Sequence, residues 1–454
     1  MDTKKFTKFF VIVFKIFAIG LLLQFLLQNF VTYILWRSGW IWNLIRLWKE
    51  IILIWLLIFI LYFLRKNKQF KDFRHKFPLK NFLIIFLSIF VVVLLVTLIF
   101  TKLSIADYVI SMRYSMTGFL IFMIFFSLSF LFFWTKEIDL SDRYVKALKW
   151  LLIASLFRWG IIWLVPRALE FVWYNQFSLE WEIWARPPAA YYTQYDHGYV
   201  RNQFIFERPI SRGFFLIALW PLFFMLALRH KWWREITFWS GMYAICVMST
   251  FSRAARWAFF VQTFILIFLQ LDSKIRKKAW YAIIPVLLWF AVLTYIGRDQ
   301  IIWRSFSNTW HIKEIARALG KIAEKPIAWQ WVSTAWPASH QVEDVTAYNP
   351  ENQYLQIWLE YGVFGFAWWM FLYLYLHYIG YVAYRREQQE KIIKKTRRFG
   401  KLVFAFSLWL LGLSIEWLVL HSFVDRMIVY PFMALFGIVY ALYYKSVSKK
   451  KSME

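Results

Sequence analysis

The chain has very little cysteine and glycine, and it has no motif of a soluble enzyme. Among its 454 residues there is one cysteine and there are 15 glycines. Cys246 therefore cannot form an internal disulfide or belong to a multi-thiolate metal cluster. The chain also has no Walker loop, no dinucleotide-binding fingerprint and no H-E-x-x-H sequence. This excludes the enzyme classes that these motifs define.

Long apolar stretches dominate the chain instead. Hydrophobic residues make up 61% of it, against about 45–50% in soluble domains. A helix needs about 20 mainly apolar residues to cross a bilayer. We expect an all-α integral membrane protein, a single polytopic membrane domain over 1–454 whose first span is a retained anchor. Its twelve predicted spans are 8–30, 48–64, 82–101, 115–134, 147–166, 212–228, 235–251, 254–271, 279–297, 354–384, 401–422 and 427–444.

The basic residues predict how these spans are oriented. Cytoplasmic loops carry an excess of Lys and Arg. Of the 54 basic residues, 33 fall in the two termini and every second loop, against 19 on the other side. We therefore expect both termini in the cytoplasm and two long outer loops, 167–211 and 298–353. The net charge of +28 can indicate a nucleic-acid partner. Because the basic residues concentrate in short cytoplasmic loops, we expect them to face membrane lipid, and we expect no nucleic-acid partner.

The first polar cluster stands at the outer start of the eighth span. Arg253 and Arg256 are three residues apart, so they share one helix face. Two arginines at a helix start can hold a diphosphate, assisted by the helix dipole. They can equally extend to lipid headgroups, and the spacing alone leaves both interpretations open.

The second cluster opens the longer outer loop. Arg304 precedes a stretch from His311 to Lys325 whose apolar residues recur with helical periodicity. This pattern predicts an amphipathic helix lying on the membrane. Arg304 can reach the same anion as Arg253, or it can be a solvated loop arginine.

The third cluster precedes and opens the tenth span. Either His340 or Glu351 can act as a general base on a sugar hydroxyl. Glu351 can also be solvated, or it can cap the helix that follows. In the eleventh span, Glu416 is an intramembrane acid, which indicates either function or helix pairing.

The order of these clusters along the chain resembles the order found in the O-antigen ligase and O-antigen polymerase superfamily of membrane glycosyltransferases. The resemblance is strongest over 249–366 and moderate over 201–248, and the first five spans match only in being hydrophobic. The family has a Ser-Arg at a span start, an outer-loop Arg before a helix, a Pro-to-His turn and an N-x-Y-L-Q-x-x-x-E-x-G-x-x-G motif. This chain reads STFSRAARWAFF, WRSFSNTWHIKEIARAL, KPIAWQWVSTAWPASH and PENQYLQIWLEYGVFGF.

The resemblance implies an enzyme of surface-polysaccharide biosynthesis in the cytoplasmic (inner) membrane, active on its extracytoplasmic face without a metal or cofactor. It implies glycan transfer from a polyprenyl-diphosphate carrier, such as undecaprenyl diphosphate, to a glycan, lipid or protein hydroxyl. Arg253 and Arg304 would hold the diphosphate and stabilise the leaving group. The other catalytic candidates are His340 and Glu351. The expected substrate-binding residues are Arg201, Arg256, His311, Asn352 and Tyr354.

Two features depart from the family pattern. Many members carry a His just before the N-x-Y-L-Q sequence, where this chain has Glu351, so the identity of the base stays open. The chain also has 29 tryptophans and 15 glycines, although an average chain of this length has about 32 glycines. Our hypothesis is that several tryptophan codons are UGA, read as glycine in the source. The positions concerned are Trp257, Trp310, Trp329, Trp331 and Trp336.

A transporter or flippase of lipid-linked sugars is the alternative function. Such proteins are built from repeats and have helices broken near the membrane midplane. We find neither feature in the sequence, and the polar residues gather at the outer face. The pattern therefore favours a transferase.

The gene tests the codon hypothesis. We expect UGA codons at Trp329, Trp331 and Trp336, because a Pro-bounded polar turn normally uses glycine for its backbone freedom. Sequencing the gene gives the answer directly, and UGG at these three positions would end the hypothesis.

Overall fold

The computed structural model describes the chain in segments. These are residues 48–66, 116–132, 141–165, 195–196, 199–202, 209–227, 233–270, 305–324, 350, 352–389, 399–418 and 426–451, with the single positions 12, 88, 91, 92 and 95. The predicted spans at 8–30, 82–101 and 279–297 lie outside these segments, apart from those single positions. They stay predictions.

Each of the other predicted spans coincides with a helix. The boundaries differ by a few residues, because the helices continue past the apolar runs into polar residues or end before them. A two-residue antiparallel hairpin, β1 (Tyr195–Asp196) with β2 (Tyr199–Val200), is a small departure from the expected all-α fold. The helices are α3 (Trp48–Lys66), α7 (Thr117–Phe132), α8 (Ser141–Leu164), α9 (Pro209–Ala227), α10 (Trp233–Met248), α11 (Arg253–Gln270), α15 (Gln353–Gln389), α16 (Phe399–Glu416) and α17 (Arg426–Lys451).

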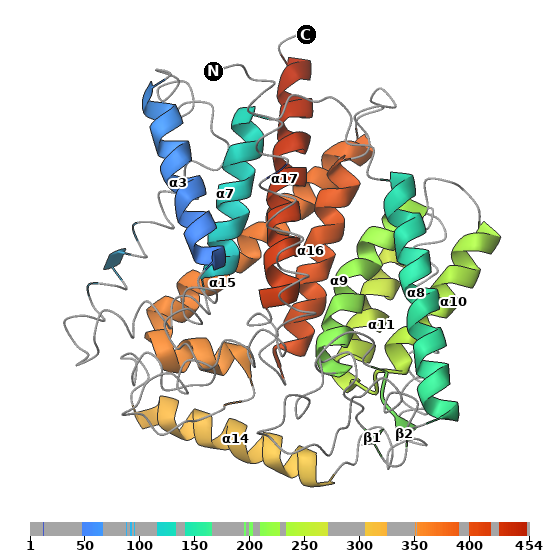
Figure 1. The fold of residues 1–454 in the computed structure, drawn as a ribbon. Coiled ribbons are helices and arrows are strands. Elements are labelled where there is room, and N and C mark those ends of the chain that lie inside the picture. Colours follow the sequence, from blue (N-terminus) through green and yellow to red (C-terminus); the bar gives the residue numbers. More distant parts are fainter. Residues whose placement is uncertain are drawn as a thin grey trace, which may run out of the picture.

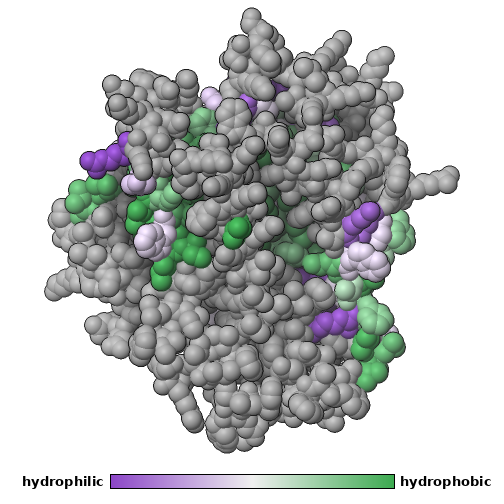
Figure 2. All heavy atoms as spheres, turned by 45° about the horizontal axis from the view of Figure 1, so that its top comes forward, coloured by the Kyte–Doolittle hydropathy of each residue, from purple (hydrophilic) through white to green (hydrophobic). Residues whose placement is uncertain are grey.

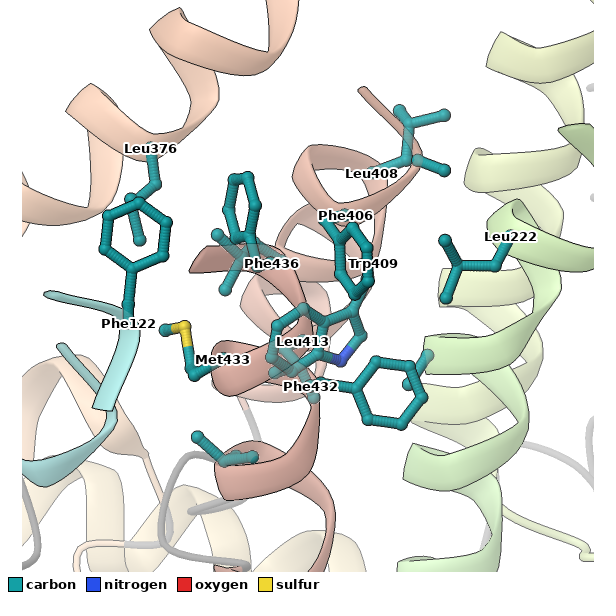
Figure 3. Packing of buried hydrophobic residues seen from close by; sticks show 14 of the residues in the cluster. Phe122, Leu222, Leu376, Phe406, Leu408, Trp409, Leu413, Phe432, Met433 and Phe436 are labelled. Carbon is teal, nitrogen blue, oxygen red and sulfur yellow. The ribbon is translucent and has the colours of Figure 1, made fainter. Parts of the chain in front are cut away.

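Helix α16 stands at the centre of the bundle. It packs against α9, α11, α15 and α17, and α17 packs in turn against α7 (Figure 1). Buried aromatic rings fill the contact between α16 and α17 (Figure 3). The ring centroids of Trp409 and Phe432 are 5.0 Å apart, and those of Phe406 and Phe436 are 5.4 Å apart. Aromatic pairs of this kind contribute about 0.5–1.5 kcal/mol each beyond their burial, so they fix how α16 and α17 meet.

Large apolar side chains also cover the outside of the bundle. Trp55 and Leu61 of α3 are 68% and 57% exposed, and Phe157 of α8 is 70% exposed. Figure 2 shows apolar side chains at the surface on two sides of the molecule. Extensive exposed apolar surface marks a region that contacts lipid or another protein.

Within the described residues, four helices are long and apolar enough to cross a membrane. The bundle also contains shorter apolar helices at Ile51–Tyr62, Thr117–Leu131 and Thr237–Met248. Together with the exposed apolar surface, these helices show the fold of an α-helical membrane protein. The four longer segments are Ile210–Ala227, Gln353–Gln388, Phe399–Glu416 and Ile428–Val447.

Helix α14 (Ser305–Glu324) lies across one end of the bundle, opposite the end where α17 finishes (Figure 1). We call this the α14 end. On the bundle side, Ala318 and Ile322 pack with Leu359 of α15. On the other side, Ile312 and Leu319 are 69% and 51% exposed. The predicted helix from His311 to Lys325 is therefore confirmed as a helix, although it begins earlier, at Ser305.

Helix α15 is broken near its start, at a glycine of the N-x-Y-L-Q-x-x-x-E-x-G-x-x-G motif. Gly362 has a φ of 64° and a ψ of −175°, which divides the helix into 353–361 and 363–389. Residues with a Cβ rarely adopt this left-handed φ. A Cβ at Gly365 would in addition collide with the side chain of Tyr361. The sequence does not reveal this break, because a glycine inside an apolar run is also tolerated in a continuous helix.

Gly362→Ala should lower the free energy of unfolding by about 1–2 kcal/mol, the cost of a side chain in the left-handed region. Gly160 is the matched control, because it lies within α8 with open space around it. Gly160→Ala should be stabilising by about 0.5–1 kcal/mol. Thermal unfolding in detergent measures both variants, and equal stability of the two would contradict this account of the break.

Candidate functional site

A hydrogen-bonded turn joins α10 to α11 at the α14 end. The hydroxyls of Ser249 and Thr250 donate to backbone carbonyls three residues earlier, at 2.8 and 2.7 Å. The hydroxyl oxygen of Ser252 accepts from the backbone amide of Ala255 at 3.4 Å, which is the bond of a helix N-cap. The turn thus satisfies its own polar groups and fixes the first turn of α11.

Phe251 is the strained residue of this turn. Its φ of 53° is left-handed, which is rare for a bulky side chain and costs about 1–3 kcal/mol. The Cζ atom of Arg256 lies 5.3 Å from the centre of the Phe251 ring. Nη2 of Arg256 donates to the carbonyl of Met248 at 2.9 Å. Backbone strain of this kind persists mainly at functional sites, so it marks the turn as a candidate.

The two residues after β2 are fastened to the same turn. Asn202 is fully buried; its backbone amide donates to the carbonyl of Ser249 at 2.8 Å, and its Nδ2 donates to the hydroxyl of Ser249 at 3.0 Å. Nε of Arg201 donates to the carbonyl of Thr250 at 3.0 Å. These bonds bring Arg201, which is about fifty residues earlier in sequence, close to Arg256.

Three arginines therefore lie at or beside the start of α11, and the charges of two of them, Arg201 and Arg256, interact. We call Arg201, Arg253 and Arg256 the arginine cluster; all three side chains are partly buried. Burial, and secondly the charge of Arg256, lower the pKa of Arg201 to about 10, so this residue still carries its charge at neutral pH. Like charges held together in a poorly solvated place are costly. Because the N-terminus of α11 adds partial positive charge, the arrangement is suited to binding a multiply charged anion.

Asn352 and Tyr354 hold the start of α15 against the end of α16. Nδ2 of Asn352 donates to the carbonyl of Leu418 at 3.0 Å, and its Oδ1 accepts from the amide of Leu355 at 3.0 Å. Asn352 is therefore the N-cap of α15. The hydroxyl of Tyr354 donates to the carbonyl of Ser414 at 3.2 Å. These contacts give both residues a role in positioning the motif, and their expected contact with substrate stays a prediction.

The arginine cluster and the start of α15 flank α16 from different sides. Nε2 of Gln262 in α11 donates to the carbonyl of Leu408, and the hydroxyl of Tyr373 in α15 donates to the carbonyl of Leu410. Leu408 and Leu410 lie about 200° apart around the helix axis, and a helix is about 10–12 Å wide. The site is thus divided into two parts, with the end of α16 between them.

The structure describes only some of the remaining predicted site residues. His311 is half-buried on the bundle-facing side of α14, near Glu314, which is buried. Glu416 is fully buried at the end of α16. Arg304, His340 and Glu351 lie outside the described residues, so their catalytic roles stay predictions.

The tryptophans at two unusual positions occupy regular helix. Trp257 and Trp310 are 43% and 48% exposed. Within the described part of the chain, only Phe251 and Gly362 have a positive φ. Neither tryptophan position therefore needs glycine for its backbone conformation. The other three positions lie outside the described segments, and the codon hypothesis stays a prediction.

The structure adds roles for four residues that lie in or beside the polar clusters of the sequence without a function assigned to them there. Buried amides are normally paired, so the polar Asn202 beside Arg201 is one signal in the sequence. The polar residues Gln353 and Gln356 at the start of an apolar span are another. Left-handed Phe251 has no signal in sequence, because phenylalanine is among the residues least expected in that conformation.

No family model, curated protein or solved structure matches this chain. Among the described side chains, no group of three His, Cys, Asp or Glu could hold a metal ion. The chemistry of the site therefore has to be inferred from the arginine cluster and the start of α15.

Inorganic pyrophosphate should raise the unfolding temperature of the protein, because a bound anion offsets the repulsion within the arginine cluster. At 100 times its dissociation constant, a ligand of the folded state contributes about 2.7 kcal/mol. Arg201→Met should reduce this shift. Arg385→Met is the matched control, since Arg385 is exposed at the far end of α15, and it should leave the shift unchanged. An equal shift in all three proteins would show that the cluster does not bind the anion.

Proposed function

We propose that this protein is a membrane glycosyltransferase of the O-antigen ligase and polymerase type. It transfers a glycan from a polyprenyl-diphosphate carrier to an acceptor hydroxyl. The observation that carries the proposal is the arginine cluster, in which three partly buried arginines lie at or beside a capped helix start next to a strained turn. A diphosphate at the end of a lipid chain is an anion whose charge and place in the bilayer fit such a site.

In the proposed reaction, the arginine cluster and Arg304 hold the diphosphate. The oxygen of the acceptor hydroxyl attacks the anomeric carbon from the face opposite the diphosphate. The bond from that carbon to the diphosphate oxygen breaks, and polyprenyl diphosphate leaves with the electron pair. The guanidinium charges stabilise this leaving group. The hydroxyl proton passes to His340 or Glu351 as general base.

The distribution of basic residues supports an extracytoplasmic site in the cytoplasmic membrane. Helix α17 ends at the opposite end of the bundle from α14 (Figure 1), and its last residues include Lys449, Lys450 and Lys451. Basic residues next to a span favour the cytoplasmic side. This supports an outer position for the α14 end and the arginine cluster.

The acceptor distinguishes three subclasses of this proposed activity. A polymerase uses the glycan of a second lipid-linked chain, a ligase uses a sugar of a lipid core, and a protein glycosyltransferase uses a Ser, Thr or Tyr hydroxyl. All three need the same donor chemistry at the arginine cluster, so the proposal is common to them.

A transporter or flippase of lipid-linked sugars is the second candidate, and the break of α15 at Gly362 favours it. Broken helices near the midplane form the binding sites of many transporters. Gly362 lies in the first third of the 37-residue helix, close to the α14 end rather than at the middle of the bundle. We therefore rank transfer first.

The test is an assay of the purified protein with a polyprenyl-diphosphate oligosaccharide and candidate acceptors, followed by mass analysis. We expect Arg253→Ala and Arg304→Ala to lower transfer by about 10²–10³-fold each, the usual effect of removing one group that stabilises the transition state. Arg385→Ala should retain normal transfer. Wild-type levels of product in either of the first two variants would refute their roles. Movement of the lipid across proteoliposomes without a new glycosidic bond would support the transporter.

A further inference from the structure

Two glutamines of α15 are buried with unsatisfied side chains. Gln353 and Gln356 have no exposed surface, and the same is true of Glu360. The spacings of three and four residues put the three side chains within about 60° of one another around the helix. They form one polar row along the segment 353–361, just before the break at Gly362.

The amides of this row have no hydrogen-bond partner among the residues that the structure describes. Both the Oε1 and the Nε2 atoms of Gln353 and Gln356 are unpaired. Gln262, another fully buried glutamine, differs in that its Nε2 donates to the carbonyls of Ile217 and Leu408, at 3.1 and 2.9 Å. Burying an amide without a partner is destabilising, and native structures rarely contain such groups without a reason. Two neighbouring examples on one helix face make this row a candidate binding surface for polar groups.

The other faces of the same segment are already occupied. Tyr354 contacts the ring of Trp417 in α16, with centroids 5.7 Å apart. Leu355 and Leu359 pack on the other side against Ile322 of α14. The polar row therefore lies on a face that is used neither for α16 nor for α14, and replacing the glutamines would disturb neither contact.

We infer that Gln353 and Gln356 bind the hydroxyl groups of a sugar. A primary amide offers donors and an acceptor side by side, which match two neighbouring hydroxyls of a pyranose, whereas the diphosphate diester of a lipid-linked sugar is fully ionised at neutral pH and offers only acceptors. This inference rests on the proposed transferase function. The two parts of the site then have separate tasks: the arginine cluster takes the diphosphate, and the row on the other side of α16 takes the glycan. The sugar belongs either to the donor or to the acceptor.

Both amides are covered, since neither Gln353 nor Gln356 has exposed surface. The bonds of Asn352 and Tyr354 hold the segment 353–361 against the end of α16. A sugar therefore reaches the row by displacing the groups that cover the two amides.

The experiment compares the double variant Gln353→Met, Gln356→Met with the wild type and with Gln262→Met. Three probes are used in binding measurements: undecaprenyl diphosphate, the lipid-linked oligosaccharide extracted from the source membranes, and the free oligosaccharide released from it. We expect the double variant to bind undecaprenyl diphosphate as the wild type does. It should bind at least one sugar-bearing probe about ten-fold more weakly, which corresponds to about 1.4 kcal/mol. A loss for the lipid-linked probe assigns the row to the donor, and a loss for the free probe alone assigns it to the acceptor.

Thermal unfolding distinguishes binding from a structural role. The double variant should unfold at the same temperature as the wild type or higher, because methionine removes no hydrogen bond there. Gln262→Met should unfold at a lower temperature, because it removes two. A double variant destabilised as much as Gln262→Met, or one that binds all three probes normally, would overturn this inference and leave the proposed function standing. A wild-type protein that binds neither lipid would overturn the proposed function and this inference with it.

Discussion

The rest of the structure depends on the packing of α16 inside a ring of other helices. Its aromatic residues interlock with those of α17, as the 5.0 Å contact of Trp409 with Phe432 shows. Its backbone carbonyls accept hydrogen bonds from Gln262 on one side and Tyr373 on the other. Hydrocarbon offers no water to satisfy polar groups, so a membrane protein has to pair them internally. These bonds fix α11 and α15 relative to one helix, and both parts of the candidate site lie at the ends of those two helices.

The turn between α10 and α11 combines rigidity with unfavourable features. Its serine and threonine hydroxyls bind their own backbone, and Asn202 ties the turn to the segment after β2. This network holds Phe251 in a left-handed conformation and brings Arg201 beside Arg256. Strain and like charge are both destabilising, and the surrounding hydrogen bonds maintain them. Such a balance is common where a protein is organised for a ligand rather than for its own stability.

The N-x-Y-L-Q motif has a physical explanation in this fold. Asn352 caps the helix, Tyr354 binds the end of α16, and Gly362 permits the break. Gly365 leaves room for Tyr361 after the chain has turned. These residues shape a short helix at one end of the bundle, and they leave Gln353 and Gln356 on a face of their own. The motif therefore supplies mainly a scaffold, and the sugar binding that we propose falls to its Gln356 and to the neighbouring Gln353.

The helices in the described part of the chain can be predicted from residue order alone, because membrane spans and amphipathic helices follow from apolar length and periodicity. The spacing of the basic residues at the start of α11 is visible there too. Three features became known only from the folded chain: Arg201 reaches Arg256, α15 is broken at Gly362, and the motif lies across α16 from the arginines. These features arise from contacts between residues far apart in sequence and from a backbone dihedral angle. A hydropathy pattern depends only on the order of residues along the chain. It therefore cannot predict contacts between distant residues or the value of a dihedral angle.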